Sequence, residues 1–242
     1  MKDLYIKLKE YFEELIKEKG IERDEISLYI KTLTPSEAIG EPIRRDYPLL
    51  DGKEALLEAQ YKGSKGQAFS SARTEFTGRL CDVLELKIGE NTYDNAIFIA
   101  VLNAVMRHYN LTENTIHCKD EEPEKCSAEI ARNIKAMGDK KVLLIGYQPS
   151  MIEKLMDEKI DLRVLDLNPD NIGQIRYGVK IEHGNIYEEA IEWCDLILCT
   201  GSTIVNGSIV NFLGEKPVYF YGTTIAGPAI ILGLNRFCYE AG

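Results

Sequence analysis

The sequence predicts an α/β protein in which a Rossmann-like, doubly wound and mainly parallel sheet follows a smaller α+β domain with an antiparallel meander. Two observations predict this fold. After residue 140, short apolar segments alternate with segments of helical periodicity, the pattern of parallel strands joined by helices. Before residue 123 this alternation is absent, and apolar segments bounded by turns occur instead. We therefore predict two domains, 1–120 and 121–242.

Composition indicates an ordinary globular protein. The chain has 242 residues, of which 45% are hydrophobic, enough for two small cores. Its 29 basic and 39 acidic residues give a net charge of −10, which disfavours nucleic acid and anionic membranes as partners. No apolar run reaches membrane-spanning length, and the charged N-terminus lacks the apolar core of a secretory signal, so we expect a cytoplasmic protein. The six cysteines are then expected to be thiols.

The first half of the chain predicts helices around a meander. Residues 3–19 have apolar side chains at helical spacing, and Gly20 suits the C-terminal turn of that helix. Turn signals at 51–52 and 62–66 separate segments with strand character. The expected strands are 25–33, 55–61 and 66–71, and the expected helices that follow are 75–86 and 94–108.

Helix 94–108 is apolar nearly all round, which is typical of a helix buried on most sides. Asn103 lies within it, and a buried amide must find hydrogen-bond partners. Two roles are open for Asn103. A structural bond to a neighbouring loop is favoured, because backbone groups satisfy most buried amides. Contact with a ligand is the alternative.

The second half is organised around one βαβ unit. Residues 142–145 are apolar without alternation, as in a strand buried on both faces, and Gly146 ends that strand. Pro149 suits the first turn of a helix, and a second strand over 162–167 contains Asp166. A helix over 123–137 precedes this unit. The expected later strands are 179–182, 195–199, 217–221 and 236–239, and the expected later helices are 187–193, 203–213 and 225–232.

Asp166 stands twenty positions after Gly146. In dinucleotide-binding folds an acidic residue near that distance bonds a ribose hydroxyl. However, the turn at 146–150 keeps only the first glycine of G-x-G-x-x-G, so ordinary NAD binding is not expected. The alternative is a structural unit in which Asp166 caps the Asn168-Pro169 turn.

Three loops rich in small or hydroxylic residues leave the carboxyl edge of the predicted sheet, where ligands bind in such folds. Glycine admits a ligand to the backbone, and Ser or Thr can cap a helix or donate to an anion. Helix capping alone is the alternative, and it explains Ser202 or Thr203. We expect an anion-accepting wall that includes the N-terminus of the 203–213 helix. The candidate ligand-binding residues are Asn103, Gly146, Tyr147, Pro149, Asp166, Asn168, Thr200, Gly201, Ser202, Thr203, Gly222, Thr223 and Thr224.

A different chemistry is suggested by HCKDEEPEKC at 117–126. His117, Cys118 and Cys126 supply soft ligands, so a transition metal ion is the cofactor that this segment would hold. Its spacing matches no standard zinc pattern, and a solvated acidic linker is the alternative. Cys126 would lie in the first turns of the 123–137 helix, which lowers the pKa of a thiol. No catalytic motif accompanies the three histidines, so the sequence leaves open whether the protein is an enzyme.

Four motifs together resemble the C-terminal Rossmann-like domain of the heavy-metal chelation family, a domain of unknown function. The first half resembles the enolase N-terminal-like domain that precedes it in that family. The resemblance implies a cleft between the two domains, lined by the loops above. The motifs are IGYQPSMIEKL, LDLNPDNIG, DLILCTGSTIVNG and YFYGTTIAGPA.

Two functions follow as hypotheses. The first is binding of a small molecule or metal complex, in heavy-metal chelation or chelator metabolism. The second is an enzyme that binds a nucleotide, phosphate or carboxylate in the same cleft. The expected partner is a small anionic ligand or a metal complex, and a homo-oligomer is left open.

Overall fold

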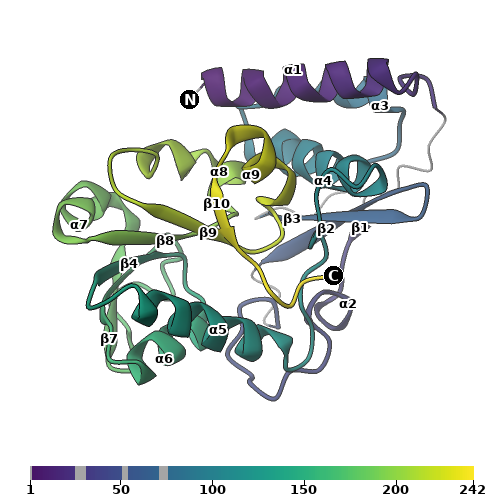
Figure 1. Ribbon diagram of the computed structural model, residues 1–242. Helices are drawn as coiled ribbons and strands as arrows, with labels where there is room; N and C mark the ends of the chain where they lie inside the picture. The colour runs from purple at the N-terminus through teal and green to yellow at the C-terminus, as the bar shows by residue number, and fades with distance from the viewer. Residues whose placement is uncertain (1, 25–30, 51–53, 71–75) are drawn as a thin grey trace.

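The computed structural model describes residues 2–24, 31–50, 54–70 and 76–242 (Figure 1). In this part of the chain the strands form two sheets. One is a three-stranded antiparallel sheet in the order β1-β2-β3. The other has seven strands in the order β10-β9-β8-β4-β5-β7-β6, all parallel except β6. The predicted α/β fold with an antiparallel meander is therefore confirmed.

The first half contains the predicted helices and meander with changed boundaries. The elements are α1 Lys2–Glu18, β1 Lys31–Thr32, α2 Pro35–Ile39, β2 Ala55–Tyr61, β3 Ser64–Ser70, α3 Leu80–Val83 and α4 Thr92–His108. Most of the predicted strand 25–33 lies outside the described residues. The predicted helix 75–86 is wrong in extent, because only four of its described residues are helical. The hairpin turn is also tighter than predicted, since Lys62 and Gly63 alone, both with positive φ, join β2 to β3.

The second half follows the predicted alternation closely. The elements are α5 Glu122–Ala136, β4 Lys141–Ile145, α6 Pro149–Asp157, β5 Asp161–Asp166, β6 Ile175–Arg176, β7 Val179–His183, η1 Gly184–Ile186, α7 Tyr187–Trp193, β8 Leu196–Thr200, α8 Thr203–Asn206, η2 Ser208–Asn211, β9 Val218–Tyr221, α9 Ala226–Leu232 and β10 Asn235–Phe237.

Two features of this half differ from the prediction. The expected helix 203–213 breaks at Gly207, whose φ of 82° is left-handed, so α8 has four residues and a short 3-10 helix follows. The β6–β7 hairpin was not predicted. Its first strand has only two residues, too short for any periodicity to appear in the sequence.

Alternate residues of the central strands face two hydrophobic cores. Val142 and Leu144 of β4 pack with α5 and α6, whereas Leu143 and Ile145 face the opposite side. On that opposite side a single core also contains residues of α1, α4 and the meander, and Figure 1 shows these elements beside α8 and α9. The division into domains at residue 120 stays a prediction, and apolar contacts run across that position.

Helix α4 is the common support of both halves. All residues from 95 to 106 are buried, as the all-round apolar pattern predicts. Gly66 of β3 allows the meander to approach α4 closely, because a Cβ atom there would lie 2.1 Å from the backbone nitrogen of Ala104.

Two expectations from composition can be compared with the structure. The six cysteines are free thiols, as expected. Among the described residues, no helix is both long and apolar enough to cross a membrane.

Candidate functional site

The strand order of the parallel sheet reverses beside β4. From β4 the chain continues to β5 and β7 on one side, and later to β8, β9 and β10 on the other. In open α/β sheets ligands bind outside the carboxyl ends of the strands at such a point. Gly146, Asp166 and Thr200 lie at the carboxyl ends of β4, β5 and β8, and Tyr221 ends β9. The topology therefore brings these four residues to one edge, which we call the switch-point edge.

Asp166 holds the loop that follows β4 through hydrogen bonds. Its Oδ2 accepts the backbone N–H of Tyr147 at 2.6 Å. Its Oδ1 accepts the backbone N–H of Asn168 at 2.7 Å and the Nδ2 of Asn171 at 3.3 Å. The capping of the Asn168 turn, the structural alternative in the sequence analysis, is thus present. Three donors therefore hold this carboxylate in place.

Gly146 and Tyr221 form close contacts with neighbouring strands at the switch-point edge. Gly146 has a φ of 93°, and a Cβ atom there would lie 2.8 Å from the Cγ2 of Thr200. A side chain at this position would therefore meet both backbone strain and Thr200. The hydroxyl of Tyr221 donates to the carbonyl of Ile145 at 3.0 Å. Burial raises the pKa of Tyr221 well above its usual value, so this hydroxyl stays protonated.

Glu54 is the residue at this edge that the sequence analysis missed. It stands just before β2, far in sequence from the parallel sheet, and its side chain is exposed to solvent. Partial loss of hydration, followed by the negative charge of Asp166, raises the pKa of Glu54 to about 7. Glu54 also helps to raise the pKa of Tyr221, which places it near the carboxyl end of β9. No local motif marks a single acidic residue before a strand, so the sequence held no signal for it.

This pKa gives a pH-dependent stability. An unfolded Glu titrates near pH 4.3, so between about pH 4.3 and pH 7 the folded protein holds a proton that the unfolded chain has lost. The contribution of Glu54 to stability therefore falls as pH rises through this window. Glu54→Gln should remove that fall, so it should be more stable than wild type at pH 8, by up to about 1 kcal/mol because solvent screens an exposed charge. Urea unfolding at pH 5 and pH 8 measures this difference, and Glu192→Gln on the exposed side of α7 is the control. A Glu54→Gln effect of equal size at both pH values would contradict the assignment.

The predicted anion-accepting wall is not assembled in the expected way. Thr203, Thr223 and Thr224 are buried, with exposed fractions of 2%, 1% and 1%. Thr203 donates to the carbonyl of Thr200 at 2.7 Å, and Thr224 accepts the backbone N–H of Phe69 at 3.0 Å. The helix expected to begin there is much shorter than predicted, since α8 has four residues and too small a dipole to hold an anion by itself. A ligand-binding role for Thr203 stays a prediction.

Gly201 and Ser202 also have local roles. A Cβ atom at Gly201 would lie 2.9 Å from the backbone nitrogen of Ile225, so this glycine serves the packing of two loops. The Ser202 side chain does not cap α8, contrary to the capping alternative. Its hydroxyl lies 3.0 Å from that of Thr200. Half-buried positions around the switch-point edge are occupied by Tyr147, Asn168, Thr200, Ser202 and Gly222, while Pro149 is buried in the first turn of α6.

Asn103 takes the structural role that the sequence analysis favoured. It is fully buried, and its Nδ2 lies 3.0 Å from the carbonyl of Gln67 and 3.2 Å from those of Thr223 and Thr224. Its Oδ1 accepts the backbone N–H of Gly227 at 2.8 Å. The amide thus joins the meander to the loop between β9 and α9.

The segment with metal-ligand residues gives no support for a metal centre. Among the described residues, no group of three or more His, Cys, Asp or Glu side chains is arranged to hold a metal ion. Burial lowers the pKa of His117 to about 4, and its Nδ1 lies 2.6 Å from the carbonyl of Cys118. The ligand set His117, Cys118 and Cys126 stays a prediction.

The expected activation of Cys126 is wrong. Burial raises the pKa of this thiol, and this effect exceeds the lowering by nearby backbone N–H groups. The helix begins at Glu122, so Cys126 stands beyond its first turn, where the helix dipole has little effect. Burial likewise raises the pKa of Cys118.

Comparison with known proteins finds a family match in the second half of the chain. Residues 130–224 match the family DUF364, described as "Putative heavy-metal chelation". This segment is therefore similar to DUF364 domains. It contains the switch-point edge and all three loops singled out in the sequence. None of the curated proteins is similar enough in sequence to count as a relative.

Two solved DUF364 structures are similar to the chain. A protein of unknown function from Pyrococcus horikoshii has a TM-score of 0.55 and 14% identity, and the match covers 91% of this chain and 79% of that one. A protein of unknown function from Desulfitobacterium hafniense DCB-2 has a TM-score of 0.50 and 14% identity, over 74% of this chain and 72% of that one. At such identity the likeness shows a shared fold alone. The enolase-like nature of the first half stays a prediction.

Proposed function

We propose that the protein binds a small cationic metal complex at the switch-point edge, in the handling of heavy metals or their chelators. The observation that supports this most is the neighbouring pair Glu54 and Asp166. Three donors hold the Asp166 carboxylate in place, and its negative charge helps to raise the pKa of Glu54. A bound cation relieves repulsion between two such carboxylates, so the pair favours a positively charged ligand.

A metal complex fits this pair better than a bare ion does. The described residues hold no group of three metal-binding side chains, and two carboxylates alone are hard ligands that discriminate poorly for heavy metals. A metal ion already coordinated by a chelator brings its own donors. The protein then has to recognise only charge and shape. The family description, heavy-metal chelation, agrees with this class of ligand.

Calorimetric titration with two complexes of opposite charge tests the proposal. Hexaamminecobalt(III) is an inert cation, whereas the nickel complex of EDTA is an anion. We expect the cation to bind at pH 8 and the anion not to bind. Glu54→Gln removes one of the two charges and should weaken cation binding about fivefold, the effect of about 1 kcal/mol at an exposed site. Glu192→Gln on α7 should leave it unchanged.

Other outcomes would contradict the proposal. Equal affinity of wild type and Glu54→Gln for the cation would show that Glu54 does not contribute to the site. Tighter binding of the anion would show that the site does not favour positive charge. The double substitution Cys118→Ser and Cys126→Ser should have no effect on the cobalt complex. Loss of copurified metal in that variant alone would instead place a metal at the predicted thiol segment.

The enzyme hypothesis is favoured by the same glutamate. A carboxyl with a pKa of about 7 can both donate and accept a proton at neutral pH. Under this alternative Glu54 is the general acid or base, and the ligand is a nucleotide, phosphate or carboxylate. A rise in melting temperature with phosphate, AMP or citrate, together with no binding of the cobalt complex, would favour it.

A further inference from the structure

Residues 33–50 form a small unit beside the switch-point edge, which we call the flap. The flap has a hydrophobic cluster of its own, separate from both main cores. Its members are Leu33, Ala38, Ile39, Tyr47 and Leu49, with Leu56 of β2 completing it. Because this cluster is distinct, the flap can move with little loss of packing in the two main cores.

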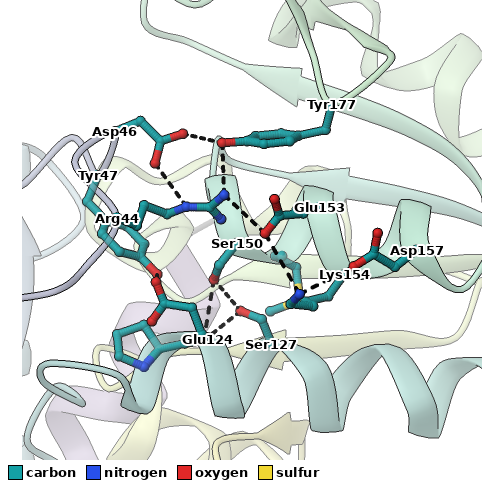
Figure 2. A network of polar contacts seen from close by, with 12 residues as sticks. Arg44, Asp46, Tyr47, Glu124, Ser127, Ser150, Glu153, Lys154, Asp157 and Tyr177 are labelled. Carbon is teal, nitrogen blue, oxygen red and sulfur yellow. Dashed lines mark hydrogen bonds and ion pairs between the residues drawn. The ribbon is translucent and has the colours of Figure 1, made fainter.

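A group of three side chains fastens the flap to the β6–β7 hairpin (Figure 2). The Nε of Arg44 lies 3.0 Å from Asp46, and its Nη2 donates to the hydroxyl of Tyr177 at 3.0 Å. The Tyr177 hydroxyl in turn donates to Asp46. Arg44 also pairs with Glu153 of α6 at 3.1 Å. We call Arg44, Asp46 and Tyr177 the clasp.

The backbone at Tyr177 is unfavourable for an aromatic residue. Tyr177 and Gly178 have φ values of 52° and 82°, and they alone join β6 to β7. A two-residue turn with both φ values positive is type I′, which prefers Asn-Gly or Asp-Gly. Since a left-handed tyrosine is strained, and strain of this kind collects at functional positions, the contacts of its hydroxyl offer the reason for its presence.

The closed flap contains buried polar atoms without partners. Among the described residues, Arg44 Nη1 and Glu124 Oε2 are buried and form no hydrogen bond. The other oxygen of Glu124 accepts the hydroxyl of Tyr47, 3.0 Å away, so Glu124 also lies against the flap. A buried polar atom without a partner destabilises the state that contains it. The clasp, the Tyr47–Glu124 bond and the bond from the Glu41 N–H to Asp120 hold the closed position, and the atoms without partners oppose it, as expected of a reversible closure.

The flap lies next to the proposed binding residues. Burial, followed by the negative charge of Asp46, raises the pKa of Tyr147, the residue whose N–H bonds Asp166. A hollow of about 870 Å³ opens where residues 43–46 face α5 and α6. Movement of the flap would thus change both this hollow and the surroundings of the loop after β4.

We propose that residues 33–50 are a movable flap which the clasp of Arg44, Asp46 and Tyr177 latches shut, and that its opening admits ligand to the switch-point edge. The closure stands on the contacts within the clasp. The admission of ligand rests on the proposed function, so the two are tested separately.

Amide hydrogen exchange tests the closure without any ligand. The reporters are amides whose hydrogen bonds cross the boundary of the flap. The Glu41 N–H bonds to Oδ1 of Asp120 at 2.8 Å, and the Asp120 N–H bonds to the carbonyl of Ile39 at 2.9 Å. Tyr177→Phe keeps the ring and its strain but loses the hydroxyl, whereas Tyr177→Asn suits the turn and also loses the hydroxyl. We expect both variants to raise flap exchange at least about tenfold and to leave β4 and β5 unchanged. Tyr239→Phe, whose hydroxyl accepts from Asn133 at the surface, is the matched control and should behave as wild type.

If the flap amides of both Tyr177 variants exchanged at the wild-type rate, the proposal that the clasp holds the flap closed would be wrong. If amides exchange faster throughout a Tyr177 variant, the hairpin itself has been weakened. Asp46→Asn leaves the hairpin sequence intact, and its flap exchange can then be compared with wild type instead. Stopped-flow binding of hexaamminecobalt(III) then tests admission, and Tyr177→Phe should raise the association rate constant at least about threefold. An unchanged rate constant with a loosened flap overturns admission but not closure. No binding of the complex to wild type contradicts the proposed function instead.

Discussion

Gly66→Ala is expected to destabilise the fold by about 3 kcal/mol or more, the upper range for an overpacked core. An added Cβ would lie 2.1 Å from the nitrogen of Ala104 and 2.5 Å from the carbonyl oxygen of Ala100. Both are backbone atoms of α4, so no side-chain rotation relieves the overlap. The meander would have to move away from the helix that supports it. Urea denaturation of the purified variant measures the loss.

Gly214→Ala is the matched control for this substitution. Gly214 is exposed, and nothing lies within 4 Å of the position that its Cβ would take. Its stability should stay within about 0.5 kcal/mol of wild type. A Gly66→Ala variant as stable as Gly214→Ala would mean that β3 and α4 are not in close contact.

Asn103→Ala is expected to cost on the order of 4 kcal/mol. The substitution removes the partner of the Gly227 N–H and of carbonyls on Gln67, Thr223 and Thr224, all in a fully buried position. Each buried backbone group left without a partner costs about 1–3 kcal/mol. The loop between β9 and α9 should also lose protection from hydrogen exchange, because Asn103 holds it to the meander.

Asn133→Ala serves as the comparison for Asn103→Ala. Asn133 lies on the half-exposed side of α5, and its Nδ2 bonds to the hydroxyl of Tyr239 at 2.9 Å. Alanine favours helix, so this change should leave stability within about 0.5 kcal/mol of wild type. If Asn103→Ala were equally mild, a ligand contact would become the better account of Asn103.

Both residues connect stability to the candidate site. Gly66 allows β3 to pack on α4, and Asn103 joins that same pair to the loop after β9. Helix α4, from the first half of the chain, thus supports the loop after β9 at the switch-point edge. Variants that weaken this support are expected to alter binding indirectly, so the binding tests above use Glu54, Tyr177, Glu192 and the two thiols, none of which belongs to it.

The sequence by itself determined the parallel sheet, the meander and the position of the loop after β4. These features depend on periodicity within about ten residues, on Gly and Pro at turns, and on the rule that carboxyl ends of parallel strands share one edge. For that reason the sequence alone places Gly146 and Asp166 at the same edge. The extent of α8 could not, because Gly207 breaks a pattern that otherwise continues as a helix.

Only the tertiary structure decided which polar residues are available for chemistry. It buried Thr203, Thr223 and Thr224 within the fold and used Asn103 as a structural bond. It also brought Glu54 to Asp166 and Tyr177 to Arg44, pairs separated by more than a hundred positions in the chain. The physical reason is that burial and charge act through space, so the pKa of a carboxyl or the partner of a hydroxyl depends on atoms that local sequence does not specify.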